Sequence, residues 1–131
     1  MRRASLIAVL VAGLSSPALA TEWVNCAAPD GAASFDYLPG ALDILSVVGM
    51  TISTGEQVWA SDPAYGPGDP VVVGQAFETT DSVRIDAVTP DITGIVASLR
   101  LFKAAEGDVI AYGGVLSMPG KGTWPVSCSA P

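Results

Sequence analysis

The chain has 131 residues, enough for one domain, with 13 acidic residues, six basic residues and no histidine. The lack of histidine excludes Ser-His-Asp and Cys-His catalysis and most zinc sites. The formal net charge of −7 argues against nucleic acid and anionic lipid as partners, because both need clustered lysine and arginine. Half of the residues are hydrophobic, so the chain can bury a core and disorder is not expected.

Residues 1–20 have the three-part layout of a cleavable secretory leader. They begin with Arg2 and Arg3, continue with an apolar run over 6–14 and end with small residues at positions 18 and 20. The run is too short for a bilayer span, which needs about 20 apolar residues. We therefore expect export to the periplasm or beyond, with no membrane insertion after cleavage.

Removing the first 20 of 131 residues leaves 111, which form one expected domain over residues 21–131. The leader takes two of the six basic residues, so the domain keeps four basic and 13 acidic residues and a formal net charge of −9. This charge predicts a soluble monomer and suits a basic partner. Arg84 and Arg100 alternate with apolar neighbours, so each is expected to face solvent and pair with a cross-strand acid such as Asp86 or Asp108.

Alternation of polar and apolar residues predicts short strands through the first half of the domain. The longest spans 42–52, where Leu42, Ile44 and Ile52 share one parity, which predicts a strand with one buried face. The segment 61–70 holds three prolines and two glycines and is predicted to be a loop. The predicted strands of this half cover residues 23–28, 34–38, 42–52 and 56–60.

Residues 89–107 are the ambiguous part of the second half. An apolar stripe from Ile92 to Phe102 fits a helix, whereas the polar and apolar residues of the same segment also alternate as in a strand. Gly94 would weaken a helix by about 1 kcal/mol relative to alanine. We therefore predict a hairpin formed by 95–103 and 108–117, preceded by one helical turn near Ile92. The other predicted strands of this half cover residues 71–77, 82–88 and 123–127.

The composition predicts an all-β fold. Ten prolines and 14 glycines in a chain of this length indicate many turns and short elements. Turn signals recur about every 8–12 residues, as in sandwiches and small barrels. We predict an antiparallel β-sandwich or small β-barrel of about eight strands.

The two cysteines, Cys26 and Cys128, stand near the two ends of the expected domain. In an exported protein a disulfide is the default state, and two cysteines permit one intramolecular pairing. Such a bond requires Cα atoms within about 7 Å of each other. The first and last strands are therefore predicted to be neighbours, or to face each other across the core, and to be joined by this disulfide. A redox-active thiol is disfavoured, because there is no C-x-x-C motif and no histidine to activate it.

No nucleophile–base set is recognisable, so we expect a protein that is not an enzyme and needs no cofactor. Lys103 and Lys121 lie beside turns and glycines, where solvent keeps a lysine charged and unable to act as a base. The 13 acidic residues leave a small carboxylate-dependent hydrolase as the enzyme class that the sequence excludes least. No spacing singles out a carboxylate pair for that chemistry.

The loop 61–70 is the candidate partner-binding site, through Asp62, Tyr65 and Asp69. A tyrosine on a proline-rich loop offers contact area at low entropic cost. Tyr65 could instead fold back and cover the end of the core. The two aspartates could contribute oxygen ligands to calcium, but aspartate beside proline or glycine is more often a turn former, so no metal is expected.

The ends of the domain resemble the small periplasmic inhibitors of c-type lysozymes, which are disulfide-tied antiparallel barrels. The resemblance rests on Cys26 followed by Asp30-Gly31, and on a late glycine-rich turn that leads to Cys128. It covers only these ends, and the family's inhibitory motif has no counterpart in the chain, so no site is carried over. The resemblance implies a basic enzyme as partner. From the residues alone, we expect a non-enzymatic domain that binds a protein or an envelope component.

Overall fold

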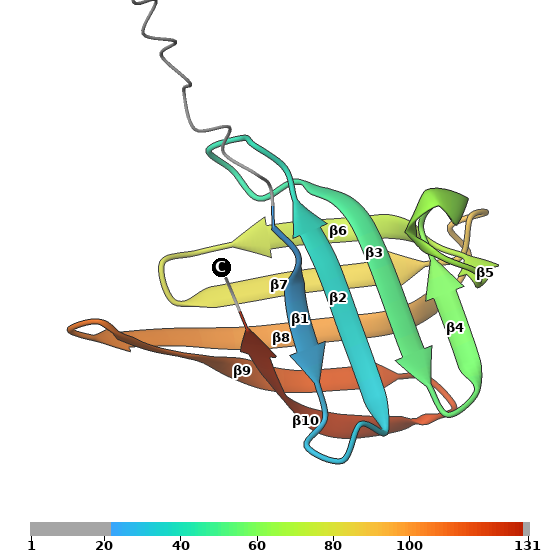
Figure 1. The fold of residues 1–131 in the computed structure, drawn as a ribbon. Coiled ribbons are helices and arrows are strands. Elements are labelled where there is room, and N and C mark those ends of the chain that lie inside the picture. Colours follow the sequence, from blue (N-terminus) through green and yellow to red (C-terminus); the bar gives the residue numbers. More distant parts are fainter. Residues whose placement is uncertain (1–21, 130–131) are drawn as a thin grey trace, which may run out of the picture.

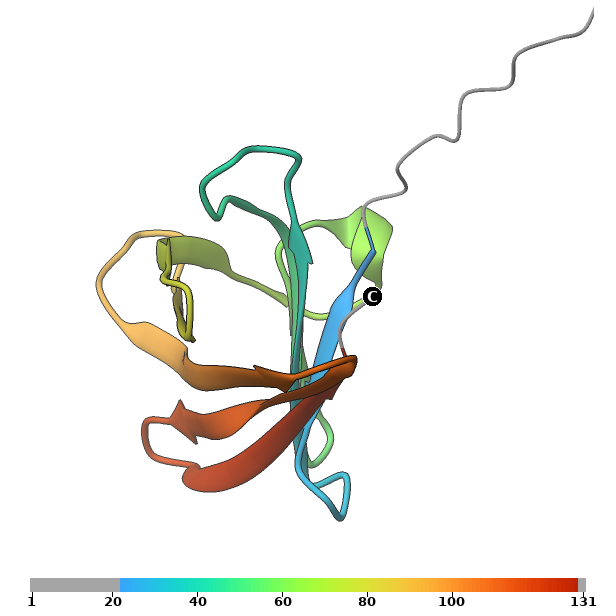
Figure 2. The same cartoon turned by 90° about the vertical axis from the view of Figure 1, so that its left-hand side faces the viewer.

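Ten strands form one curved sheet that wraps into a nearly closed barrel (Figure 1, Figure 2). This computed structural model describes residues 22–129, so the predicted leader over residues 1–20 lies outside the described part. The all-β prediction is confirmed, with ten strands in place of about eight. The elements in chain order are β1 (Val24–Ala27), β2 (Ala33–Pro39), β3 (Val47–Thr54), β4 (Gln57–Ala60), the 3₁₀ helix η1 (Pro63–Tyr65), β5 (Asp69–Pro70), β6 (Val72–Glu78), β7 (Ser82–Val88), β8 (Ile95–Glu106), β9 (Val109–Met118) and β10 (Gly122–Ser129).

The sheet consists of two meanders of five strands each. The strand order is β5-β4-β3-β2-β1-β10-β9-β8-β7-β6, so consecutive strands are neighbours within β1 to β5 and again within β6 to β10. We call these the N-terminal and C-terminal meanders. Neighbouring strands are antiparallel except β4 and β5, which are parallel. The meanders join through the pairing of β1 with β10, which confirms that the first and last strands are neighbours.

The predicted disulfide is confirmed and lies at the junction of the two meanders. Cys26 and Cys128 are direct cross-strand partners, their Sγ atoms are 2.05 Å apart and their Cα atoms 4.0 Å apart. The bond closes a loop with a sequence separation of 102. In the chain-entropy model, a loop of about 100 residues contributes about 4.7 kcal/mol to stability. The bond is compatible with an oxidising compartment. No helix within residues 22–129 has the length and apolar character needed to cross a membrane.

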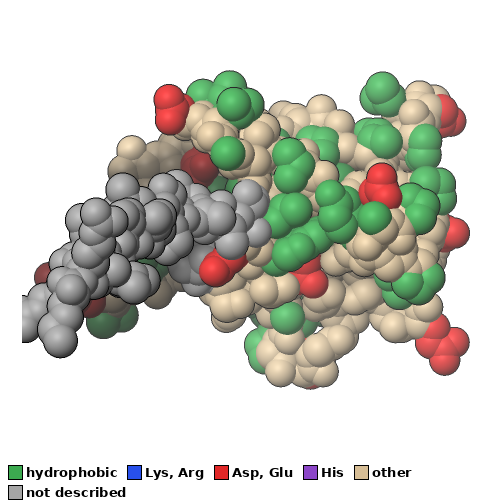
Figure 3. Space-filling view, turned by 45° about the horizontal axis from the view of Figure 1, so that its top comes forward, with side chains coloured by type: hydrophobic (Ala, Val, Ile, Leu, Met, Phe, Trp, Pro, Cys, Tyr) green, Lys and Arg blue, Asp and Glu red, His purple; other side chains and the backbone are tan. Residues whose placement is uncertain are grey.

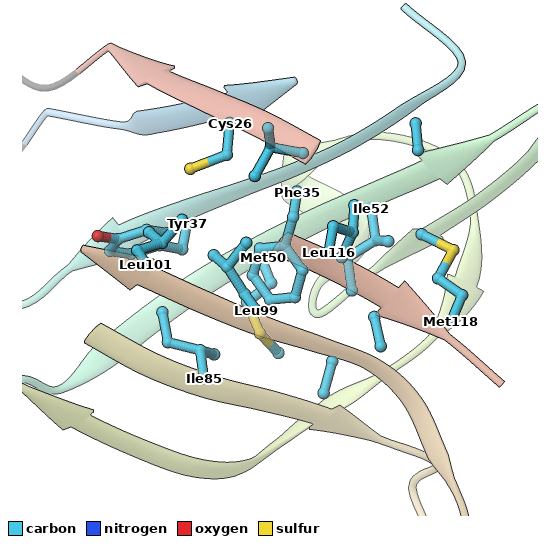
Figure 4. Close-up of a cluster of buried hydrophobic side chains, with 14 of the residues drawn as sticks. Cys26, Phe35, Tyr37, Met50, Ile52, Ile85, Leu99, Leu101, Leu116 and Met118 are labelled. Atoms are coloured by element: carbon cyan, nitrogen blue, oxygen red, sulfur yellow. The ribbon is translucent and has the colours of Figure 1, made fainter. Parts of the chain in front are cut away.

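The barrel interior is a hydrophobic core to which both meanders contribute (Figure 4). Inward positions alternate along the strands, as in β2, where Ala33, Phe35 and Tyr37 are buried, and this is the period of two that the sequence shows. Complete burial of such a side chain stabilises the fold by about 1.5–3 kcal/mol. The largest fully buried side chains are Phe35, Met50, Ile52, Ile85, Leu99, Leu101, Leu116 and Met118.

The strand predicted over 42–52 is wrong in its first part, because β3 begins at Val47. The preceding residues 40–46 form a loop, closed by a hydrogen bond of 2.7 Å from the Gly40 N–H to the Ser46 carbonyl. Leu42 and Ile44 are 67% and 76% exposed, so the predicted buried face does not include them. The alternation continues into the loop, but β2 pairs with β3 only from Val47 onward and offers the loop no partner.

The ambiguous segment is a strand, since β8 (Ile95–Glu106) pairs with β9 (Val109–Met118) and confirms the predicted hairpin. The helical turn predicted near Ile92 is wrong. The Asp91 carboxylate accepts hydrogen bonds from the Thr89 and Thr93 hydroxyls and from the Thr93 N–H. Such local bonds compete with the helical ladder. They hold Ile92 at a φ of 60°, which is rare for a β-branched residue.

The one strand that the sequence did not predict, β5, lies inside the predicted loop 61–70. Asp69 and Pro70 form the two-residue strand β5, which is parallel to β4 at one edge of the sheet. Proline is tolerated at such an edge because its missing N–H does not interrupt a ladder. The rest of the segment is irregular apart from η1, in which the Asp62 carboxylate caps the first turn.

Candidate functional site

We call the end of the barrel where β2, β6, β8 and β10 finish the open end, and Figure 1 shows these strand ends. Exposed apolar side chains gather there. The loops of the open end are residues 40–46, 79–81 and 107–108. Large exposed apolar side chains on a soluble domain mark interaction surfaces when they gather in one region. We call the following set, with exposures between 58% and 76%, the apolar rim: Leu42, Ile44, Phe77, Phe102, Val109 and Ile110.

The β8–β9 hairpin projects beyond the rest of the barrel. Its pairing with β7 ends at Phe102, and its pairing with β10 begins at Gly113, so the tip between them has both edges largely free. Figure 1 shows this hairpin reaching past the neighbouring strands. Val109 and Ile110 point to opposite faces, yet they are 72% and 68% exposed. The tip therefore presents apolar side chains on both faces, and Gly107 makes its turn at a φ of 59°.

The open end is acidic. Its loops and the adjoining strand ends carry two basic residues. Lys103 Nζ donates a hydrogen bond to the Glu78 carboxylate, and Arg84 is the cross-strand neighbour of Phe77. The face of the molecule seen in Figure 3, which is only part of this region, carries acidic and hydrophobic side chains. An acidic field around apolar side chains favours a basic partner. The acidic residues of this end are Asp43, Glu78, Asp81, Glu106 and Asp108.

A polar cluster lies behind the rim, at the end of the core. The hydroxyls of Tyr37 and Tyr112 share a hydrogen bond, and the Lys103–Glu78 ion pair belongs to the same end. Burial raises the pKa of both tyrosines, and the bond to Tyr112 raises the pKa of Tyr37 further. Both phenols therefore stay neutral and are unsuited to act as bases. The Lys103 side chain is 25% exposed, so it is partly solvated and partly covered by its ion pair with Glu78.

A groove runs along the open end between the loop 40–46 and the end of β6, and we call it the seam groove. Its volume is about 760 Å³. Asp43 and Glu78 bring carboxylates to it, while Ile44 and Phe77 bring apolar side chains from the rim. Pockets of about 300–1,000 Å³ are the usual size for ligand sites. The lining residues are Asp43, Ile44, Leu45, Ala76, Phe77, Glu78, Thr79 and Thr80.

The three residues of the predicted partner-binding loop lie outside the open end and make local contacts. Asp62 Oδ1 accepts the Ala64 N–H at 2.8 Å and caps η1. Asp69 Oδ2 lies 3.5 Å from the Gln57 Nε2 that donates to it. Tyr65 folds back onto the sheet, but onto its outer face rather than over the end of the core as the alternative prediction had it. The role of this loop in partner binding stays a prediction.

Tyr65 covers a small hydrophobic cluster on the outer face of the N-terminal meander. Its ring centroid lies 5.2 Å from that of Trp23 in an edge-on arrangement, and its hydroxyl donates to the Val48 carbonyl at 3.3 Å. Gly49 lies beneath both rings. A Cβ on Gly49 would be 2.9 Å from Tyr65 Cε2 and 3.1 Å from Trp23 Cη2. The cluster therefore depends on the missing side chain of Gly49.

Of the two predicted arginine–acid pairs, one is confirmed. Arg100 Nη1 lies 2.8 Å from Asp86 Oδ1, and Gln75 Nε2 donates to Asp86 Oδ2 at 2.5 Å. Burial acts to raise the pKa of Asp86, but hydrogen bonds from Arg100, Ser98 and Gln75 outweigh it and hold this pKa below its usual value. A carboxyl held ionised in this way serves as an anchor between β6, β7 and β8.

Sequence reasoning missed the open end as a candidate site. A usable signal was present, because Val109 and Ile110 directly follow the polar turn of the predicted hairpin, where apolar side chains have little chance of burial. Among residues 22–129, no group of three or more histidine, cysteine or acidic side chains could hold a metal ion. No family model, curated protein or solved structure matched the chain.

Proposed function

We propose that this chain is an exported, non-enzymatic domain that binds a protein or an envelope component through its open end. The observation that carries the proposal is the apolar rim, whose six side chains are each more than half exposed around one end of the barrel. Burial of such side chains against a partner contributes about 25 cal/mol for each Å² removed from water. We place the domain in the periplasm or outside the cell, on the basis of the leader and the disulfide.

The distribution of the other exposed apolar side chains supports the choice of this end. Outside the rim, most of the large exposed apolar side chains are between 37% and 53% exposed, less than any member of the rim: Val48, Val58, Val73, Ile95 and Val115. They lie on the body of the barrel or at its far end rather than in the hairpin tip. Ile92 at 74% is the exception, and it stands alone on its loop. The rim is thus the main concentration of uncovered apolar surface in residues 22–129.

The test is a capture experiment with the protein recovered after export, so that its leader has been processed and its disulfide formed. The test variant replaces Phe102, Val109 and Ile110 by serine. The control variant replaces Ile92 and Ile95 by serine at the far end of the barrel. We expect the test variant to lose envelope components that the wild-type protein and the control both capture. Equal capture by all three proteins would contradict the proposal.

A more specific candidate is a basic enzyme as the partner, such as a c-type lysozyme. The acidic residues around the rim favour it, because complementary charge speeds association and steers orientation. The measurement is lysozyme turnover with and without the exported protein at low and high salt. Inhibition that weakens steeply with salt would support the candidate, since exposed charges are screened beyond about 10 Å at 0.1 M salt. Unchanged turnover at low salt would contradict it.

A further inference from the structure

The barrel is incomplete along one side, which we call the seam. The strand order ends with β5 on one side and β6 on the other, and no pairing joins these two strands. β6 (Val72–Glu78) pairs only with β7. The strand across the seam from it, β5, has only two residues. Figure 2 shows β6 diverging from the N-terminal meander. The edge of β6 that faces the seam is therefore an unpaired strand edge.

The free edge of β6 carries backbone groups that could pair with another strand. The Thr79 N–H donates to the Ser82 carbonyl at 2.9 Å, so these two residues form a hydrogen-bonded pair. Bonded and non-bonded pairs alternate along an antiparallel ladder. Phe77 consequently bonds to β7, whereas Ala76 and Glu78 turn their N–H and C=O groups toward the seam. A row of such groups is a template for strand addition.

A β-bulge limits the length of this template. The register of β6 on β7 shifts between Val73 and Gln75. Bulges twist an edge strand away from regular pairing and are a common protection of exposed edges. The regular part of the free edge therefore begins after the bulge, and this is the part that lines the seam groove.

Side chains beside this regular part suit a basic segment. Asp43 lies in the groove and is exposed, and the Glu78 side chain is 38% exposed despite its ion pair with Lys103. Ile44 and Phe77 flank the carboxylates and are among the most exposed apolar residues of the chain. An extended peptide places alternate side chains on one face, so basic and apolar groups could both find partners here.

Building on the proposed function, we propose that β6 binds an extended, lysine- or arginine-bearing segment of the partner as an additional strand in the seam groove. Main-chain hydrogen bonds to Ala76 and Glu78 provide affinity, and the groove side chains provide specificity. A second copy of this chain is the poorer occupant. Pairing two β6 edges brings two Glu78 carboxylates together between acidic domains, and like charges across a strand pair are destabilising.

The test uses a defined probe, an alternating Lys–Val peptide of about eight residues, the length of an ordinary strand. The matched probes are an alternating Glu–Val peptide and a Lys–Val peptide methylated at alternate backbone nitrogens. Binding is followed by peptide fluorescence anisotropy, and amide hydrogen exchange is read at Ala76 and Glu78. We expect only the unmodified Lys–Val peptide to bind and to slow exchange at these two amides. Equal binding of the methylated peptide, or no binding of the Lys–Val peptide, would overturn the proposal.

Variants of the protein test the edge directly. Ala76→Pro removes the N–H that faces the seam without touching a bond to β7, and it should weaken binding about tenfold. Ala76→Ser keeps the N–H and should bind as the wild-type protein does. Asp43→Asn should weaken binding about threefold, whereas Glu56→Gln, in the turn between β3 and β4, should leave it unchanged. Melting curves check that each variant is folded. Undiminished binding by folded Ala76→Pro would overturn the proposal.

Two further outcomes separate the inference from the proposed function. If the rim variant loses partner capture and Ala76→Pro keeps it, strand addition is wrong while the open end remains the binding surface. If neither variant loses capture, both proposals fail. Sedimentation of the unbound protein tests whether a second copy of the chain occupies the β6 edge instead. If the wild-type protein is a dimer and Ala76→Pro is a monomer, the occupant is a second copy and the peptide proposal is wrong.

Discussion

The two junctions between the meanders differ in how they are closed. At the first, β1 pairs with β10, and the disulfide between Cys26 and Cys128 joins the two strands. At the second, the chain itself passes from β5 through Val71 into β6, and the strands separate toward the open end. Val71 is only 1% exposed, so this crossing is anchored in the core at its start.

The contrast separates stability from recognition within one small domain. The closed junction holds the first and last strands together. In the chain-entropy model, the disulfide there stabilises the fold by restricting the conformations of the unfolded chain. The open junction leaves strand edges and apolar side chains uncovered, and these are the features that partners use. A change at the first junction should therefore alter stability more than binding, and a change at the second should do the reverse.

Removal of the disulfide is expected to have the largest effect. The double variant Cys26→Ala, Cys128→Ala should lose about 2–5 kcal/mol of unfolding free energy, because its unfolded chain regains the freedom that the bond removes. Urea unfolding followed by tryptophan fluorescence measures the loss. Wild-type protein treated with reductant is the control and should match the variant. A loss below about 1 kcal/mol would show that strand pairing alone closes this junction.

Filling the space beneath Tyr65 should lower the unfolding free energy by less than removal of the disulfide does. Gly49→Ala places a methyl group against the rings of Tyr65 and Trp23, and such overpacking costs about 1–3 kcal/mol. The control is Gly94→Ala, where a Cβ has its nearest neighbour at 3.9 Å, an ordinary contact, so stability should hold or rise slightly. Urea unfolding compares both with the wild-type protein. If Gly49→Ala is as stable as the wild-type protein, the cluster does not need this close approach.

The smallest effects should come from two carboxyls whose pKa values move in opposite directions, one in each meander. Burial raises the pKa of Asp36 and outweighs hydrogen bonds from the Cys26 N–H and the Thr51 hydroxyl. The native state therefore binds the Asp36 proton more tightly than the unfolded state does. Ionised Asp36 weakens the fold at neutral pH, and this effect disappears as pH falls to the ordinary value of 3.8.

The pKa of Asp86 shifts in the opposite direction, since it is lowered. Its contribution to stability is present above the ordinary value of 3.8 and is lost as pH falls through the lower native pKa. At pH 7, Asp86→Asn should destabilise the protein by about 1 kcal/mol or less, and Asp36→Asn should leave stability unchanged or increase it. Urea unfolding at pH 7 and pH 3 checks the signs. Equal changes in unfolding free energy for the two variants would contradict the opposite pKa directions of Asp36 and Asp86.

The sequence predicted most of the scaffold because the scaffold depends on local patterns. Alternation placed β7 at its observed bounds, and the two cysteines identified which strands must be neighbours. Turn residues located the β8–β9 hairpin against a competing helical stripe. The failures occur where alternation continues without a neighbouring strand, as at Leu42 and Ile44, or where side-chain hydrogen bonds set the backbone, as at Asp91.

The candidate site was less predictable, because it depends on which strands lack a neighbour. Whether Phe77 is covered depends on the distance between β6 and the other meander, and no local pattern encodes that distance. The proline-rich loop attracted attention through its composition, yet Tyr65 packs against Trp23 instead of facing a partner. Composition identified a loop correctly and could not say what its side chains cover.

The position of the disulfide has a consequence for connectivity. Read from β6 through β10 and then from β1 to β5, the strands follow one another around the sheet in unbroken order. Apart from the parallel pair β4–β5 and the open seam, the fold thus has the strand order of an up-and-down barrel whose backbone is cut between β1 and β10, with the usual turn absent there. The sulfur–sulfur bond takes the place of that turn. A circular permutant that joins the present termini and opens the chain near Val71 would keep every strand neighbour while moving both new ends to the seam.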